Sequence, residues 1–377
     1  MRLLQSLLTT SPSSWRDIAG DLDPAAAQIV LIFGLRAPLA EPASLAAIRA
    51  RFASARLVLV STAGNFAGTE IHDDALVCTA IGFDSATSRC VSTHLAQGGD
   101  LHELCEDLAA SLIAPGLRHV FVFSDGGIVN GTTLSKAFNK TLPAGVTISG
   151  GVAGDGTDFL VTLVGLDSPP EPGVIVAVGL YGPSLHVTFG TVGGWSSFGP
   201  ARTVTASEGN VLHTLDQRPA LALYKEYLGP AAAGLPSAAL RFPLSVTTAE
   251  QPNAVVRTIL SIDENAGTMT FAGDIPVGAT VRLMRASYEE IIHGAEDAAR
   301  LAAQNAELVV CVSCVGRRIV LGQRIEEELE GVRDVFGPGP VIAGFYSYGE
   351  LAPTGEARAC QLHNQTMTIT SIAEEKA

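Results

Sequence analysis

Two tyrosines and a carboxylate lie close together near the C-terminus, in the segment Ala343-Gly-Phe-Tyr-Ser-Tyr-Gly-Glu350. In an extended chain alternate side chains face the same way, so we expect Tyr346, Tyr348 and Glu350 to share one face around Ser347. Phenol rings desolvate a bound molecule, while hydroxyls and a carboxylate fix its orientation. The alternative is that both tyrosines are core residues with satisfied hydroxyls. The spacing alone leaves these two interpretations balanced.

A second set of polar residues follows the neighbouring predicted strands. Cys314 and Arg317 come at the end of an apolar strand, where a guanidinium could hold a carboxylate through two hydrogen bonds. His363 and Asn364 begin a polar segment that leads into the last predicted strand, His363 to Ile372. The alternatives are a surface arginine beside a helix and a histidine that only closes a turn. We predict that these four residues complete a polar shell around a ligand.

The cysteines and His363 allow a metal site to be tested on spacing. Cys311-x-x-Cys314 and Cys360-x-x-His363 supply four potential zinc ligands in two pairs. Cys311 lies within an apparent buried strand, however, where residues three apart point to opposite faces. No Gly or Pro supplies the turn at Val312-Ser313 that a zinc knuckle needs. We therefore expect no metal.

Two small-residue loops in the first half form a secondary candidate site. Ser124 and Asp125 end one predicted strand, and Gly151 to Asp155 end the next. Such loops can bind an anion through backbone N–H groups. The glycine spacing is not that of a dinucleotide-binding motif, and it leads into a strand instead of a helix. Nor is there a Gly-x-Ser-x-Gly nucleophile motif, so a hydrolase would have an unidentified nucleophile.

Composition and charge exclude several classes of protein. The hydrophobic fraction of 47% is ample for folding, and the 377 residues suggest two domains. A net charge of −14 without a basic cluster argues against nucleic acid as a partner. The longest apolar run, Val174 to Tyr181, is far short of the ~20 residues that span a membrane. The N-terminus lacks a proper signal peptide, so we expect a cytoplasmic protein with free thiols.

The elements that position these residues alternate between strands and helices. The order strand, small-residue loop, helix and strand occurs at His119 to Asp155 and again at Leu308 to Glu350. Such units place their strand-end loops on one edge of a sheet. The capping pair Ser287 and Glu290 predicts the start of another helix. We predict an α/β fold of mixed sheets flanked by helices, in two similar halves, residues 1–195 and 196–377.

Several of these motifs together resemble the FIST family of sensory proteins, over nearly the whole chain. The residues that carry the resemblance are Ser61-Thr62-Ala63-Gly64, Phe123-Ser124-Asp125-Gly126, Gly150 to Asp155, Leu215-Asp216, Pro219-Ala220-Leu221, Leu321-Gly322, Glu327-Glu328-Leu329, Gly344 to Glu350 and His363-Asn364-Gln365-Thr366. Asn65 departs from the pattern, because the family tends to place Glu after Ser-Thr-Ala-Gly. That departure moves the expected ligand contacts to the C-terminal half.

The resemblance implies an intracellular signal-input protein that binds a small ligand such as an amino acid. It also implies a separate signalling partner, such as a sensor kinase or a cyclic-nucleotide enzyme. Some members of the family bind haem and sense nitric oxide, so a haem sensor with a histidine ligand is the first alternative. A hydrolase is the second. We expect a binding protein that is not an enzyme and needs no cofactor, with a site at Tyr346, Tyr348, Glu350, Arg317 and His363.

Overall fold

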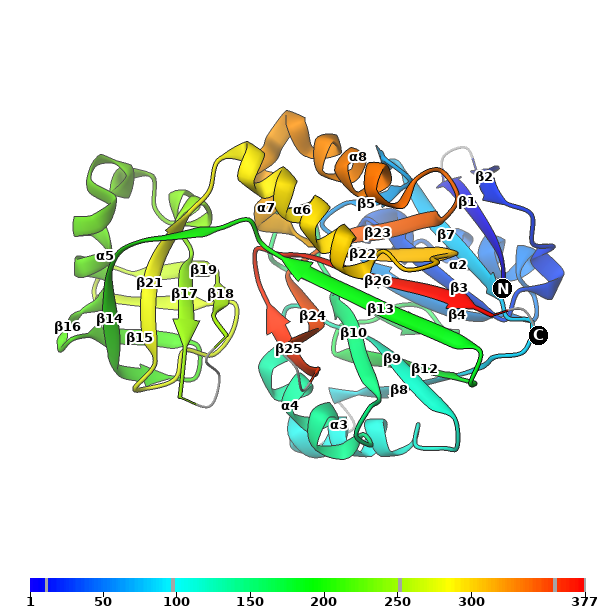
Figure 1. Cartoon of the computed structure of the whole chain (residues 1–377), viewed down its shortest axis with the longest axis horizontal. Helices are drawn as coiled ribbons and strands as arrows, with labels where there is room; N and C mark the ends of the chain where they lie inside the picture. Colours follow the sequence, from blue (N-terminus) through cyan, green and yellow to red (C-terminus); the bar gives the residue numbers. More distant parts are fainter. Residues whose placement is uncertain (11–12, 96–98, 250–252, 355–357, 376–377) are drawn as a thin grey trace.

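We describe a computed structural model, which places residues 1–10, 13–95, 99–249, 253–354 and 358–375. Three mixed sheets with the same arrangement make up most of the chain, and we call this part the body. A fourth, antiparallel sheet with its helices occupies residues 196–285, which we call the small lobe. Figure 1 shows the small lobe at one end of the molecule, with both chain termini towards the other end.

Each body sheet is built on one parallel strand–helix–strand unit. β9 (Leu117–Ser124) and β10 (Thr147–Val152) form the predicted unit in the first half, and β22 (Leu308–Cys314) and β23 (Val341–Ser347) form the predicted unit in the second. A third unit, which we did not predict as part of the repeat, is made by β3 (Ile29–Gly34) and β4 (Arg56–Ser61). In every sheet the first parallel strand also pairs with an antiparallel neighbour, namely β7 (Ala75–Gly82), β12 (Val174–Tyr181) or β26 (Met367–Glu374).

The three body sheets have the following strands, in their order across each sheet. Sheet 1 contains β11 (Val164–Leu166), β4 (Arg56–Ser61), β3 (Ile29–Gly34), β7 (Ala75–Gly82), β1 (Arg2–Thr10) and β2 (Ser13–Gly20). Sheet 2 contains β25 (Ala359–His363), β24 (Gly349–Thr354), β10 (Thr147–Val152), β9 (Leu117–Ser124), β12 (Val174–Tyr181) and β8 (Thr87–His94). Sheet 3 contains β13 (Leu185–Val192), β26 (Met367–Glu374), β22 (Leu308–Cys314), β23 (Val341–Ser347), β5 (Asn65–Ala67) and β6 (Glu70–Ile71).

The sheets are tied together by a cyclic exchange of strands. After its second parallel strand, each unit sends a strand into another unit's sheet. β5 follows β4 but pairs with β23, β24 follows β23 but pairs with β10, and β11 follows β10 but pairs with β4. The loops after β4, β10 and β23 therefore meet, with Ala63 N donating to Tyr346 O at 2.8 Å and Gly154 N to Ser61 O at 2.9 Å.

The inner faces of the three sheets share one apolar core, and helices cover their outer faces. The shared core includes Phe33 from sheet 1, Phe123 from sheet 2 and Phe345 from sheet 3, all fully buried. The outer faces are covered by α1 (Arg36–Ala40) and α2 (Pro42–Arg51) on sheet 1, α3 (Leu101–Ala110) and α4 (Gly131–Thr141) on sheet 2, and α6 (Tyr288–Ala302), α7 (Val315–Leu321) and α8 (Ile325–Phe336) on sheet 3. Short 3-10 helices lie at η1 (Pro24–Ala26) and η5 (Gly322–Arg324).

The small lobe has its own core and leaves the body through two adjacent strands. The chain enters the small lobe through β14 (Ser196–Glu208) and returns through β21 (Thr280–Arg285), with Ser196 paired to Arg285. Its elements are β18 (Val255–Arg257), β17 (Leu244–Thr247), β21 (Thr280–Arg285), β14 (Ser196–Glu208), β15 (Val211–Leu215), β20 (Thr268–Phe271), β19 (Ile259–Asp263), β16 (Arg218–Pro219), α5 (Ala220–Leu228), η3 (Gly229–Gly234) and η4 (Ser237–Arg241).

The predicted α/β class with mixed sheets is confirmed. The capping pair Ser287 and Glu290 begins α6, and both of its reciprocal hydrogen bonds are present. The prediction of one final strand from His363 to Ile372 is wrong in its bounds. β25 ends at His363 and β26 begins at Met367, because residues 364–366 turn the chain from sheet 2 into sheet 3. The division at residues 195 and 196 stays a prediction. Within the described residues, no helix combines the length and apolar character needed to cross a membrane.

Candidate functional site

The predicted ligand-facing segment, residues 343–350, is divided between two sheets. β23 ends at Ser347 in sheet 3, β24 begins at Gly349 in sheet 2, and Tyr348 lies between them. The polar groups of the segment therefore reach different partners. Tyr346 donates to Glu328, Tyr348 to Asp155, and Glu350 accepts from Ser347. The structure does not bring these three side chains together as one polar surface.

Arg317 and Tyr346 belong to a buried network within the protein. The fully buried Arg317 donates through Nη2 to Oε2 of the equally buried Glu328 at 2.8 Å and through Nε at 3.1 Å. It also donates to the carbonyls of Gly193 and Ile291, at 2.6 and 2.8 Å. Tyr346 donates to the other Glu328 oxygen at 2.8 Å. The carboxylate that we expected from a ligand is thus supplied by Glu328.

Glu350 lies in a second closed polar cluster. Ser347 Oγ donates to its Oε1 at 2.9 Å, and Thr366 donates to its Oε2 through Oγ1 at 2.9 Å and through its backbone N–H at 3.2 Å. Burial raises the pKa of Glu350 to about 8, although these hydrogen bonds oppose the shift. The carboxyl is therefore largely protonated at neutral pH. All three residues are buried, and none of them lines the cavity described below.

His363 and Asn364 are also buried behind the cavity. Burial, helped by the nearby Arg257, lowers the pKa of His363 to about 4, so its ring is neutral. Its Nε2 has no hydrogen-bond partner among the described residues. Asn364 donates to the carbonyl of His363 at 2.9 Å and accepts from the backbone N–H of Thr258 at 3.5 Å. Asn364 thus joins the body to the small lobe.

The secondary candidate in the first half serves mainly to shape loops. The Asp125 carboxylate accepts from the backbone N–H groups of Gly127, Ile128 and Gly173, at 2.6 to 2.9 Å. Ser124 is fully buried and donates to the Asp125 carbonyl at 3.3 Å. Gly151 pairs with Glu350, and a Cβ there would lie 2.7 Å from a Val312 methyl group. Those groups are occupied, and the loop they hold forms part of the cavity wall.

Asp155 organises the segment that follows β10. It accepts from the backbone N–H groups of Phe159, Leu160 and Val161 at 2.8 to 3.0 Å, and from the hydroxyl of Tyr348. Burial alone would raise the pKa of Asp155, but the hydrogen bonds from Tyr348 and the three amides lower it. An ionised Asp155 thereby fixes residues 159–161 against Tyr348.

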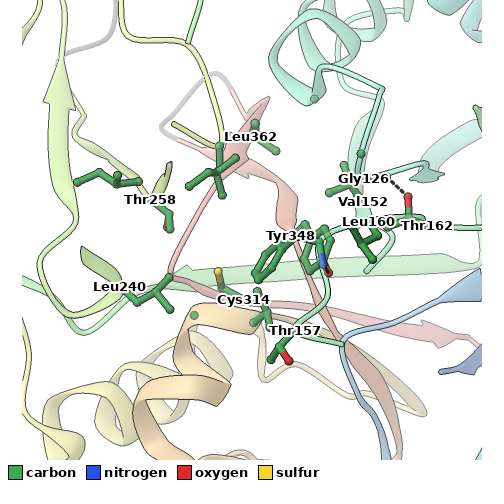
Figure 2. Close-up of a pocket in the computed structure, with 18 of the residues that line it drawn as sticks. Gly126, Val152, Thr157, Leu160, Thr162, Leu240, Thr258, Cys314, Tyr348 and Leu362 are labelled. Atoms are coloured by element: carbon green, nitrogen blue, oxygen red, sulfur yellow. Dashed lines mark hydrogen bonds between the residues drawn. The ribbon is translucent and has the colours of Figure 1, made fainter. Parts of the chain in front are cut away.

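A cavity of about 510 Å³ lies between the body and the small lobe. Its body wall comes from the loops after β9 and β10, the start of α4 and the end of β10, at Gly126, Gly127, Val129, Gly131, Val152, Thr157, Phe159, Leu160 and Thr162. Its small-lobe wall is made by Pro236, Ser237, Leu240, Thr258, Ile259, Leu260 and Ala272. Cys314, Val315, Gly316, Tyr348 and Leu362 complete it from sheets 2 and 3 and α7. Figure 2 shows Thr258 and Leu240 on one side of the cavity and Gly126, Leu160 and Thr162 on the other.

The walls of this cavity are largely apolar. None of the described residues that line it carries a charge. Its size lies within the range of about 300–1,000 Å³ that is usual for small-molecule sites. Leu160 from the body and Leu260 from the small lobe are 74% and 46% exposed, so the rim is apolar on both sides. The arrangement can desolvate a small molecule and hold it against both parts of the protein.

Two of the predicted site residues do line the cavity, Cys314 and Tyr348. The Tyr348 ring stacks on Phe159 with 4.6 Å between the ring centres, while its hydroxyl is bonded to Asp155. Tyr348 therefore offers its ring, but not a free hydroxyl, to a ligand. Burial raises the pKa of the Cys314 thiol, so it remains protonated. A protonated thiol contributes packing and a weak hydrogen bond.

The cavity lining does not fit zinc or haem. Cys311 and Cys360 lie in separate apolar cores, away from Cys314 at the cavity. Among the described residues, no group of three or more potential metal ligands is present. Haem would need an axial ligand and cations for its propionates, yet no described lining residue is a histidine, an arginine or a lysine.

Sequence reasoning missed most of the cavity. Its small-lobe wall comes from η4 and from residues near β19, which carry no catalytic motif. The apolar run Phe159-Leu160-Val161 gave no signal either, because in the sequence it is typical of a buried strand, and only the structure shows that its side chains are exposed.

Comparisons with known proteins agree with the resemblance read from the motifs. A model of the FIST N domain matches residues 28–218, and a model of the FIST C domain matches residues 220–353. No curated protein matches the chain significantly. Among solved structures, the chain is similar to the crystal structure of a cyanuric acid hydrolase from A. caulinodans, at 9% identity and a TM-score of 0.34, over 94% of this chain and 92% of that one. So low a TM-score supports no statement about activity.

Proposed function

Since the chain belongs to the FIST family, we propose that it senses a small molecule that binds in the cavity between the body and the small lobe. FIST domains are generally small-ligand sensory domains of signal transduction. The observation that carries the proposal is the origin of the cavity walls, which come from both parts of the protein. A ligand there would contact both parts at once.

Binding of such a ligand would change the position of the small lobe relative to the body. The small lobe is joined to the body through two adjacent strands, β14 and β21, and through a few polar contacts. Arg257 donates to the carbonyl of Leu362 at 2.9 Å, and Asn130 donates to Asp274 at 3.2 Å. A ligand that binds one position of the lobe better than another shifts the population towards that position. We propose that a separate signalling protein, such as a kinase or a cyclic-nucleotide enzyme, reads this shift.

We propose binding in preference to catalysis. Ser347 donates to Glu350 at 2.9 Å, an arrangement that resembles a nucleophile beside its base. Both are buried outside the cavity lining, so a molecule in the cavity would not reach them. The Cys314 thiol does line the cavity but is protonated, which makes it a poor nucleophile. An amino acid, the ligand class we expected from the resemblance, would also need partners for two charges.

The experiment that tests this proposal is a thermal-shift screen with a cavity-filling variant. A panel of small metabolites, amino acids included, is screened against the natural protein and against Ala272→Trp, which places an indole in the cavity. A ligand at 100 times its Kd adds about 2.7 kcal/mol of stability to the natural protein. We expect Ala272→Trp to lose that response. Leu301→Trp, at an exposed position on α6, is the matched control and should keep it. A hit that stabilises all three proteins equally would place the ligand elsewhere.

A further inference from the structure

We infer that the ligand of the cavity is an uncharged, mainly apolar molecule that makes a hydrogen bond to Thr258 through one polar group. This inference rests on the proposed function, because it concerns the same cavity, and it names the class of ligand and the residue that selects it. Three features of the described residues support it: the absence of charge in the walls, the unpartnered hydroxyl of Thr258, and the apolar rim.

The walls oppose a charged ligand because nothing in them would compensate its charge. A charge that leaves water must be paired or it costs a great deal of free energy. The described lining residues have no ionisable acid or base other than the Cys314 thiol and the Tyr348 phenol, both held protonated by burial. Buried charged groups beside the walls are already bonded within the protein. Arg317 is paired with Glu328, and Asp155 is bonded to Tyr348 and Arg36. Asp125 accepts from three backbone N–H groups, and Arg257, next to Thr258, donates to three carbonyls.

Thr258 is the buried polar side chain in the described walls that lacks a partner, whereas Thr157 and Ser237 are exposed to water. The residue is 4% exposed, and its Oγ1 has no hydrogen-bond partner among the described residues. Its backbone is well anchored, since its carbonyl accepts from Ala272 N at 2.9 Å and its N–H lies 3.5 Å from Asn364 Oδ1. A buried hydroxyl without a partner is unfavourable, and a hydrogen bond to a ligand removes that cost. By contrast, the Thr162 hydroxyl already accepts from Gly126 N at 2.8 Å.

The rim favours the same class of ligand. Leu160, Phe159 and Leu260 are exposed at the cavity and apolar. They come from the two parts of the protein that the cavity separates, so an apolar molecule between them removes apolar surface of both from water. Across the cavity from Leu160, Thr258 would meet the single polar group of such a molecule (Figure 2).

Three compounds that share a naphthalene ring linked to a phenyl ring test the inference. N-phenyl-1-naphthylamine is uncharged, carries one N–H group and fluoresces strongly in apolar surroundings. 1-Benzylnaphthalene replaces the N–H by a methylene group, and 8-anilinonaphthalene-1-sulfonate adds a negative charge. Binding of the amine and the sulfonate is measured by fluorescence titration, and binding of the hydrocarbon by competition with the amine. The proteins are the full natural chain, Thr258→Val, Thr258→Ser and Ala272→Trp.

We expect the natural protein to bind one molecule of the amine. It should bind the sulfonate at least ~10-fold more weakly, because the charge stays unpaired. It should bind the hydrocarbon about 3- to 10-fold more weakly, because the bond to Thr258 is missing. Thr258→Val, which keeps the shape of the side chain, should bind the amine as weakly as the hydrocarbon. Thr258→Ser keeps the hydroxyl, so it should again bind the amine more tightly than the hydrocarbon.

Two kinds of failure are distinguishable. If the natural protein binds the amine and Ala272→Trp does not, the cavity is a small-molecule site. Equal affinities for the three compounds, or a Thr258→Val variant that still prefers the amine over the hydrocarbon, would then overturn the inference alone. If the natural protein fails to bind the amine, or if Ala272→Trp binds it equally well, the proposed site itself is wrong. Circular dichroism and melting curves of each variant separate these results from misfolding.

Discussion

Arg317 and Thr258 are both buried polar residues, but they differ in what surrounds them. Arg317 lies in a closed network, where Glu328, Tyr346 and two carbonyls supply partners from within the protein. Thr258 lies at a cavity wall, and its hydroxyl has no partner among the described residues. The sequence draws attention to the first, because an arginine beside a tyrosine-rich motif suggests recognition. The comparison teaches that a residue suited to binding is available for it only where the protein leaves it unpaired.

The largest effect should come from breaking the closed network. Arg317→Met keeps the bulk of the side chain but leaves the Glu328 carboxylate buried without its cation. We expect a loss of about 3–5 kcal/mol of unfolding free energy, measured with a chemical denaturant. Arg300→Met, at an exposed ion pair on α6, is the control and should change little. If Arg317→Met instead kept the unfolding free energy of the natural protein and weakened only ligand binding, Arg317 would belong to a binding site.

A second test uses the proton on Glu350. Its folded-state pKa is raised to about 8 from 4.5, so the folded protein keeps a proton that the unfolded chain releases. The contribution of Glu350 to the unfolding free energy is therefore lost as pH rises from 4.5 to about 8. His363 and His119, whose pKa values are lowered from 6.5 to about 4 and about 3, act in the opposite direction below pH 6.5. The histidines and the N-terminal amine still titrate between pH 6.5 and 8, so the effect of Glu350 is isolated by comparison with Glu350→Gln, in which those groups are unchanged.

Between pH 6.5 and 8 we expect the unfolding free energy of the natural protein, relative to that of Glu350→Gln, to fall by about 1.5 kcal/mol. Denaturant titrations of both proteins at several pH values measure this difference. Glu350→Gln cannot ionise at this position, so the other titrating groups contribute equally to both proteins and cancel. A difference that does not change with pH would show that Glu350 is hydrated and ionised, as a ligand-facing carboxylate would be.

A smaller effect is expected on the cavity side of the comparison. Tyr348→Phe removes the hydroxyl that bonds Asp155 and that accepts from the backbone N–H groups of Asp155 and Phe159. The ring and its stacking on Phe159 remain. We expect a loss of about 1 kcal/mol of stability, with binding of N-phenyl-1-naphthylamine nearly unchanged. Loss of dye binding without loss of stability would mean that the hydroxyl itself contacts the ligand.

Haem should have the smallest effect of all. No described residue that lines the cavity is a histidine, and none can pair with a propionate. Haem titrated into the purified protein should give the same Soret band as haem in buffer alone. It should not raise the protein's free energy of unfolding. A sharp Soret band that disappears in a single histidine variant would establish the haem sensor, the first alternative that the resemblance implies.

Much of the fold could be predicted from local patterns, whereas most of the cavity could not. Ser287 and Glu290 mark the start of α6, and the apolar run Val174–Tyr181 is strand β12, because capping and hydrophobic runs depend on neighbouring residues. Cys314 and Tyr348 were predicted because they follow strands whose ends meet at one edge. Thr258 was not, because the cavity is assembled from three separate parts of the chain, residues 126–162, 236–272 and 314–362. Only tertiary packing decides that Arg317 is paired and Thr258 is not.

The central claim is that a ligand in the cavity contacts the body and the small lobe together. Hydrogen–deuterium exchange of the natural protein, with and without N-phenyl-1-naphthylamine, tests it most directly. We predict slower exchange in two separate sets of peptides, residues 126–131 and 157–162 of the body and residues 236–241 and 257–262 of the small lobe. Protection confined to residues 317–350, or to one side of the cavity only, would contradict this account.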